Sequence, residues 1–268
     1  MKKILLVLLS AMPFVFPGCN LWEDRKACPK ILAIDCSLLE GKALYADIWI
    51  FGPQEGLLAR SRVDEHEFYR KQIFEVQEGD YNCYVWANLG DETILTDINT
   101  LGGKIYKSSS GIGDPLFEFA KSAECRKDSV MLRVVPRKMF IDVFITLNGL
   151  KDGEKASAEL MCPYGGFTLA GEPLMQQSLA CAEGNHLLHL RMMRPGKLEG
   201  TALAILFARK DGRELRSDFE LGNYLVQNNY DLLSDNLKDI YITIDVAKMK
   251  TVIGTQPFEN VPPVPIRF

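Results

Sequence analysis

The chain has 268 residues, of which 47% are hydrophobic and 25% are charged, a balance that excludes a disordered, collagen-like or low-complexity protein. Acidic residues outnumber basic residues by 35 to 31, and no run of basic residues is present. Because phosphate binding requires a basic surface, nucleic acid is not an expected partner. The length allows one large domain or two domains of roughly 100 to 150 residues each.

The N-terminal residues have the pattern of an export signal. Two lysines precede an apolar run that ends at Phe16, and this run is shorter than the roughly 20 residues that span a bilayer as a helix. Cys19 follows directly after Gly18, as in a bacterial lipobox. We therefore predict a signal peptide over residues 1–18 and lipidation of Cys19, which would hold the mature chain on a membrane. The alternative is an ordinary cleavable signal in which Cys19 has no special role.

A short polar stretch over residues 19–27 follows the predicted lipidation site. Its acidic residues, Glu23 and Asp24, resemble the surface-export signal of Bacteroidetes lipoproteins. A solvated spacer explains the two carboxylates equally well. The prediction for this stretch is therefore a lipid-anchored spacer.

Six cysteines remain after Cys19, and in an oxidising compartment they can pair in several ways that the sequence does not distinguish. No C-x-x-C pair is present, so the spacing does not indicate a zinc site. Cys36 and Cys83 lie in strand-like runs, where buried free thiols are at least as plausible as disulfides. Cys162 with Cys181 is the most local pair, whereas Cys28 with Cys125 would join the start of the mature chain to the end of its first half. The disulfide candidates are Cys28, Cys125, Cys162 and Cys181.

Two-residue alternation of apolar and polar side chains dominates the first half and predicts strands. Such strands are expected at residues 44–51, 68–76, 81–89 and 129–135, with a Gly-containing turn at 77–80 that makes a hairpin. Residues 90–128 contain many loop signals and are expected to be irregular, with room only for a short helix at 115–123.

The second half repeats this pattern after Pro136. Its strongest strand is expected at residues 139–147, and we place a domain boundary near Val135 to Lys138. The predicted fold is all-β, with two antiparallel β-sandwich domains over residues 28–136 and 137–268. The remaining strands are expected at residues 156–162, 184–193, 201–208, 214–221 and 239–246.

No catalytic or metal-binding constellation emerges, so neither an enzyme nor a cofactor or metal is predicted. His186 and His189 form an H-x-x-H pattern, but strand alternation places the two rings on opposite faces. His66 lies between two glutamates in a polar loop, which indicates a solvated turn. Trp49 and Trp86 could stack on sugars, although strand tryptophans with an apolar opposite face are more often core residues.

The order of these features resembles the FimB/Mfa2 family of fimbrial anchor subunits from Bacteroidales. The resemblance rests on the lipobox cysteine, on Cys28-Pro29 shortly after it, and on the hairpin sequence EGDYNCYVWANLGD. It also includes the segment SVMLRVVPRKMFIDVFITLNGL. The hairpin is the strongest element, because the family has a similar Gly-x-Tyr and Trp-Gly-Asn pattern there, with Ala87 standing here in place of the usual glycine. The resemblance as a whole covers residues 19–150 well, and it covers the second half only by the strand pattern.

This resemblance implies two transthyretin-like β-sandwich domains in a lipoprotein of the outer membrane. It also implies a fimbrial role, in which the chain anchors, caps or limits the length of a fimbria, with other fimbrial subunits as partners. Such subunits are thought to assemble by strand addition. Four prolines after Gln256 would make the C-terminal tail a poor donor strand, although a surface-packed terminus is the simpler interpretation. The alternative function is that of a glycan-binding surface lipoprotein of a polysaccharide-uptake system.

Overall fold

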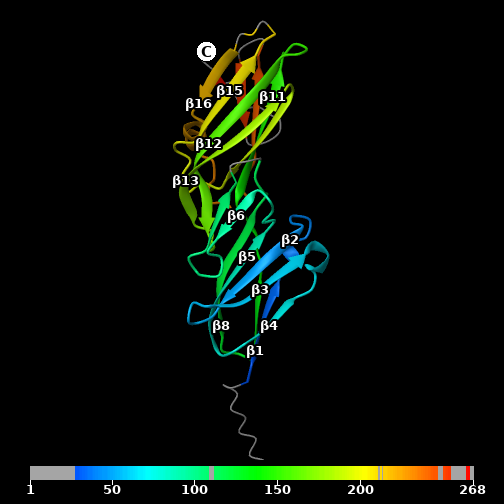
Figure 1. Cartoon of the computed structure of the whole chain (residues 1–268), viewed down its shortest axis with the longest axis vertical. Helices are drawn as coiled ribbons and strands as arrows, with labels where there is room; N and C mark the ends of the chain where they lie inside the picture. The colour runs from blue at the N-terminus through cyan, green and yellow to red at the C-terminus, as the bar shows by residue number, and fades with distance from the viewer. Residues whose placement is uncertain are drawn as a thin grey trace, which may run out of the picture.

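The computed structural model describes residues 28–108, 112–210, 212, 214–246, 250–254 and 264–265. It is an elongated molecule built almost entirely of strands, with the two halves of the chain stacked along its long axis (Figure 1). The predicted all-β class is therefore confirmed. The predicted signal peptide, Cys19 and the spacer lie outside the described residues.

The first half is a sandwich of two sheets. Sheet A has the strand order β4-β1-β9, and sheet B has the order β10-β8-β5-β2-β3. Alternate residues such as Leu32, Ile48 and Val85 point between the sheets into a common core. Short 3-10 turns, η2 (Ser37–Leu39) and η3 (Glu65–Glu67), connect the two sheets. The strands are β1 (Lys30–Asp35), β2 (Tyr45–Phe51), β3 (Leu57–Asp64), β4 (Gln72–Val76), β5 (Gly79–Ala87), β8 (Phe117–Cys125), β9 (Ser129–Arg133) and β10 (Arg137–Lys138).

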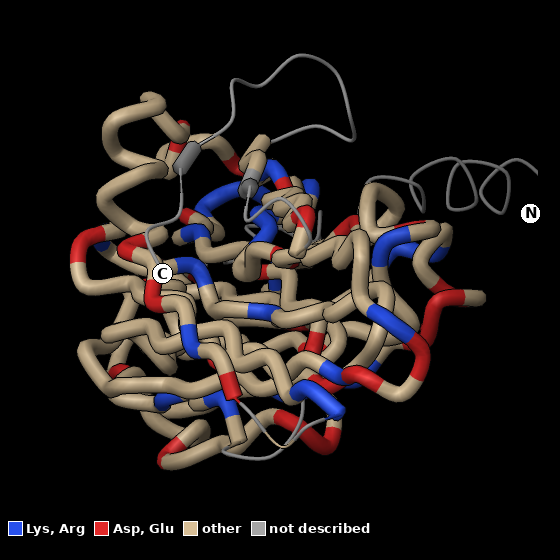
Figure 2. The backbone as a smooth tube through the Cα atoms, turned by 90° about the horizontal axis from the view of Figure 1, so that it is seen from above, with Lys and Arg blue, Asp and Glu red and all other residues tan. Residues whose placement is uncertain are grey.

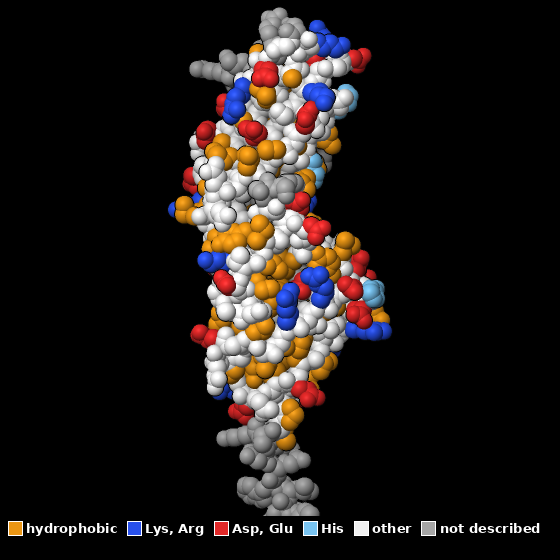
Figure 3. Space-filling view, viewed as in Figure 1, with side chains coloured by type: hydrophobic (Ala, Val, Ile, Leu, Met, Phe, Trp, Pro, Cys, Tyr) orange, Lys and Arg blue, Asp and Glu red, His pale blue; other side chains and the backbone are white. Residues whose placement is uncertain are grey.

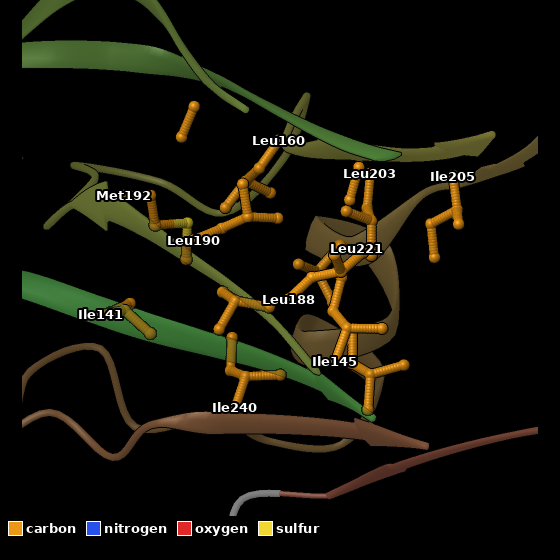
Figure 4. Packing of buried hydrophobic residues seen from close by; sticks show 14 of the residues in the cluster. Ile141, Ile145, Leu160, Leu188, Leu190, Met192, Leu203, Ile205, Leu221 and Ile240 are labelled. Atoms are coloured by element: carbon orange, nitrogen blue, oxygen red, sulfur yellow. The ribbon is translucent and has the colours of Figure 1, made fainter. Parts of the chain in front are cut away.

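The second half is also a sandwich, with the short helix α2 (Leu221–Gln227) packed against it. Sheet D has the order β14-β11-β17-β18-β19, and sheet C has the order β16-β15-β12-β7-β6 with β13 also paired to β12. Isoleucines and leucines from both sheets and from α2 fill the space between them (Figure 4). The strands are β11 (Phe140–Asn148), β12 (Lys155–Thr168), β13 (Pro173–Gly184), β14 (Leu187–Met193), β15 (Ala202–Ala208), β16 (Glu214–Phe219), β17 (Ile240–Asp245), β18 (Lys250–Gly254) and β19 (Val264–Pro265).

Each sandwich contains one parallel strand pair, which the prediction of antiparallel sheets did not include. β1 runs parallel to β9, and β11 runs parallel to β17. Parallel neighbours require a long crossover connection, and here each crossover includes strands of the facing sheet. The other pairings of the described strands are antiparallel.

A third core joins the two halves. The hairpin of β6 (Thr93–Thr96) and β7 (Lys104–Lys107) comes from the first half but adds to sheet C, because β7 pairs with the end of β12. A Cβ on Gly166 would lie 2.8 Å from the carbonyl oxygen of Ile105, so this pairing depends on a glycine. The indole Nε1 of Trp86 donates to the carbonyl oxygen of Leu169 at 2.8 Å. The junction core contains Trp49, Phe51, Trp86, Leu89, Ile105, Leu116, Met139, Phe167, Leu169 and Met193.

Several sequence predictions are wrong in detail. Residues 90–128 are not irregular, since β6, β7 and β8 lie within them, and the helix predicted at 115–123 is the strand β8. Phe117 and Phe119 both turn toward the first core with a two-residue period, and β5 supplies the hydrogen-bonding partner. The strand predicted at 68–76 begins only at Gln72, and β13 was not predicted. The domain boundary near Val135 to Lys138 stays a prediction. The hairpin β6–β7 precedes this boundary in the sequence but pairs with β12, which follows it.

Candidate functional site

The described chain begins in a strand at the centre of sheet A. β1 pairs with β4 on one side and with β9 on the other, and its Leu32 and Ile34 side chains are fully buried. The Nζ of Lys30 lies 3.4 Å from an Oδ1 of Asp128 in the turn between β8 and β9. A tether attached before β1 would therefore act directly on the first core rather than on a peripheral loop.

Two edges of the sheets carry charges of the kind that discourage further strand pairing. β3, at one end of sheet B, contains Arg60, Arg62 and Asp64, and β16, at one end of sheet C, alternates acidic and basic residues. Asp47 is buried beside β3 and is held by Arg62 at 2.6 Å. These edges therefore resemble protected edges.

The edge of sheet A at β9 is different. Its sequence is SVMLR, with one charged residue at its end, and Met131 is 55% exposed. Ile73, Ala33 and Met131 lie side by side in register on the outer face of sheet A. Because natural edges are usually blocked by charge or proline, this apolar edge is a candidate site for an added strand.

The hairpin motif that carries the family resemblance has a structural role. Asn88 has a positive φ of 62° and connects three segments of backbone. Its Oδ1 accepts from the amide of Leu44 at 2.9 Å, and its Nδ2 donates to the carbonyl of Pro115 at 3.0 Å and to that of Lys42 at 3.4 Å. The hydroxyl of Tyr81 donates to the carbonyl of Gln77 at 2.9 Å and fixes the preceding turn.

No disulfide joins any two of the six cysteines of the described chain in this structure. The local pair Cys162 and Cys181 does not fit the register: Cys162 lies opposite Ser178, three residues from Cys181, or about 10 Å along the strand. The two side chains also lie on opposite faces, one buried and one exposed, so a disulfide between them is excluded by geometry. Pairing of Cys28 with Cys125 stays a prediction. Burial raises the pKa of Cys36 and Cys83 to about 12, as expected for inert core thiols.

His189 takes part in a polar cluster that the sequence did not reveal. Its Nε2 lies 2.8 Å from an Oδ1 of Asp142, which also accepts from Nε of Arg191 at 2.7 Å. The ring stacks on Phe144 with centroids 4.5 Å apart. Arg191 also donates to the carbonyl of Gly113 at 2.9 Å, so the cluster helps to join the two halves.

Among the described residues, no group of three or more His, Cys, Asp or Glu side chains could hold a metal ion. Within the same residues, no helix is long and apolar enough to cross a membrane. Basic and acidic residues are intermixed along the chain (Figure 2), in agreement with the lack of a basic run in the sequence.

No protein-family model matches the sequence, and no curated protein matches it. Solved structures do match. A candidate adhesin from Bacteroides ovatus has a TM-score of 0.67 and 12% identity, over 90% of this chain and 96% of that one. A candidate polysaccharide-binding protein from Bacteroides thetaiotaomicron has a TM-score of 0.65 and 12% identity, over 85% and 96% of the two chains. The fimbrial anchor protein Mfa2 from Porphyromonas gingivalis has a TM-score of 0.60 and 13% identity, over 85% and 98%. This chain therefore shares the fold of these proteins over nearly their whole length.

Proposed function

We propose that the protein is a lipid-anchored fimbrial subunit at the outer membrane, which anchors, caps or limits the length of a fimbria. The observation that carries this proposal is the fold shared with the fimbrial anchor Mfa2 over 98% of that chain. Similar structures are described as adhesins, a polysaccharide-binding protein and a fimbrial anchor. The same comparison supports a binding role rather than a catalytic one.

The proposed anchor is a lipid on Cys19. We expect Cys19→Ala to move the protein from the membrane fraction to the soluble fraction. Without the lipid, only the apolar run that ends at Phe16 could contact the membrane, and this run is too short to span a bilayer as a helix. The measurement is fractionation together with metabolic labelling by an acyl-chain analogue. A matched Cys28→Ala variant should keep both the label and the membrane location. Continued labelling of Cys19→Ala would contradict lipidation at this residue.

The proposed contact with a neighbouring subunit is strand addition at the β9 edge of sheet A. An extended segment there would extend sheet A from three strands to four and would cover Met131. Main-chain hydrogen bonds would supply affinity, and alternate side chains would supply specificity. The C-terminal tail is proposed to be a poor donor, because Val264–Pro265 already pairs with β18 and a proline lacks the amide that a ladder requires. The prolines at 257, 262 and 263 lie outside the described residues.

The test of the fimbrial role is a comparison of subunit capture with fimbriation. Deletion of the whole protein should release fimbriae from cells or change their length. Met131→Lys should keep the protein folded and membrane-bound but reduce its capture of fimbrial subunits at least tenfold, because a charge is placed on the accepting edge. The matched control is Leu187→Lys, which puts the same charge at an equally exposed position on edge strand β14. Unchanged fimbriae in the deletion strain would refute the fimbrial role, and equal capture by the two lysine variants would refute the β9 edge.

The alternative function is glycan binding at the cell surface within a polysaccharide-uptake system. It is favoured by the shared fold with the candidate polysaccharide-binding protein. The two functions differ in which proteins co-purify from outer membranes. Fimbrial subunits are expected with the first function, and glycan-uptake proteins are expected with the second.

A further inference from the structure

Two adjoining hollows lie near the junction of the halves. Hydrophobic and charged side chains are intermixed on the face of the molecule shown in Figure 3. The first hollow, of about 330 Å³, is lined by loops of the first half and by Tyr45. The second, of about 450 Å³, is lined by residues of both halves, including Phe117 and Asn236. Lys42 and Pro115 line both hollows, so the two hollows are neighbours, and together they are here called the junction groove. Ligand sites commonly have such volumes and commonly lie between domains.

The walls of the junction groove are fixed by hydrogen bonds rather than left mobile. Asn88 connects the backbone of Lys42 and Leu44 to that of Pro115 on the first-half side. On the other side, Nζ of Lys138 lies 2.6 Å from Oδ1 of Asp239, which also accepts from the backbone amide of Asp142 at 3.1 Å. The groove is therefore preformed, which lowers the entropic cost of binding a ligand.

The charges of the groove nearly cancel. Asp142 is paired with Arg191 and Asp239 is paired with Lys138. With Arg191 included, three basic and four acidic groups surround the groove, and these are mixed rather than separated. An ionic ligand would therefore find no complementary field. The other charged residues of the lining are Lys42, Glu65 and Asp114.

The remaining chemistry suits a polyhydroxylated, uncharged ligand. Tyr45 and Pro115 line the groove and give it apolar surface against which the C–H face of a sugar ring can pack. Carboxylate oxygens such as those of Asp239 accept hydrogen bonds from hydroxyl groups, and the Asn236 amide both donates and accepts. We propose that the junction groove binds a neutral oligosaccharide. This site stands apart from the proposed fimbrial contact at β9, and it gives the protein a glycan-binding activity whether or not the fimbrial role holds.

The test is calorimetric titration of the full chain, solubilised in detergent, with maltohexaose, mannohexaose and N-acetylchitohexaose. A hyaluronan hexasaccharide serves as the anionic probe. We expect saturable binding of at least one neutral hexasaccharide and a Kd at least tenfold weaker for Tyr45→Ala. Asn236→Ala should weaken binding similarly, and because Asn236 is exposed and its turn bonds are made by its backbone, this variant should keep the fold. Tyr69→Ala, an exposed tyrosine outside the groove, should bind as the parent does.

Four results would overturn the proposal. The first is no saturable binding of any of the three neutral probes at millimolar concentration, and the second is binding of the anionic probe alone. The third is sugar binding that both groove variants retain. The fourth is loss of fimbrial-subunit capture in Asn236→Ala without any sugar binding. The last result would make the groove a protein-docking site. Met131→Lys should leave sugar binding unchanged, so failure of the groove and failure of the fimbrial contact can be told apart.

Discussion

Trp86→Ala is expected to lower the free energy of unfolding by about 3 to 5 kcal/mol, the range for truncating a large buried aromatic side chain. Trp86 is fully buried in the junction core, where its ring lies 5.5 Å from that of Phe167. The substitution also leaves the buried carbonyl of Leu169 without its indole donor. Because this core is shared by both halves, we expect the loss of Trp86 to turn one unfolding transition into two. The measurement is guanidinium unfolding followed by far-UV circular dichroism.

A second variant at Trp86 and a control at an exposed position separate the contributions to this loss. Trp86→Phe keeps most of the apolar contact and removes the hydrogen bond, so it should cost about 1 to 2 kcal/mol. Leu233→Ala removes a side chain that is 90% exposed and should change stability by less than about 0.5 kcal/mol. If Trp86→Ala were no more destabilising than Leu233→Ala, the junction would not be a cooperative core.

Glu118→Gln is expected to stabilise the protein at pH 8 and to have little effect at pH 4.5. Glu118 is 4% exposed, and burial raises its pKa to about 7, against the opposing influence of Arg137 and Arg194. The loop at Gly171 approaches it so closely that a Cβ there would lie 2.7 Å from Cδ of Glu118. The carboxyl group is therefore enclosed between the two halves.

The direction of the pH dependence follows from proton binding. Between the ordinary value of 4.5 and about 7, the folded chain holds the Glu118 proton while the unfolded chain releases it. Stability therefore falls as pH rises through this window, by at most about 3 kcal/mol. Glu118→Gln removes this dependence because the amide does not titrate. The matched control is Glu124→Gln, an exposed position on the same strand, which should leave the pH profile unchanged. A parent protein as stable at pH 8 as at pH 5, after correction by this control, would contradict the raised pKa of Glu118.

The sequence alone was sufficient for the strands that bury one face. In β2, β5, β11 and β17 the residues that face the core of the sandwich recur at every second position, because the period of two follows from the pleat. The burial of Trp49 and Trp86 followed from the same argument, since both faces of their strands are apolar. The absence of helical periodicity was likewise enough to predict an all-β chain.

Tertiary structure decided the features that depend on distant partners. Phe117–Cys125 became a strand rather than a helix because the edge of β5 was free to pair with it. β6 and β7 are too short to be recognised by alternation, and they are held by β12, some sixty residues later. The register of β12 and β13, which no local pattern encodes, separates Cys162 from Cys181.

The candidate sites show the same division. Lipidation of Cys19 is a prediction that needs no tertiary structure, because a lipobox pattern is local in the sequence. The β9 edge, the Asp142–Arg191 pair and the junction groove could not be predicted, because their residues come from loops and strands that are adjacent only after both sandwiches have formed. Local alternation determines which face of a strand is buried, whereas long-range pairing determines which edges stay open and which loops meet.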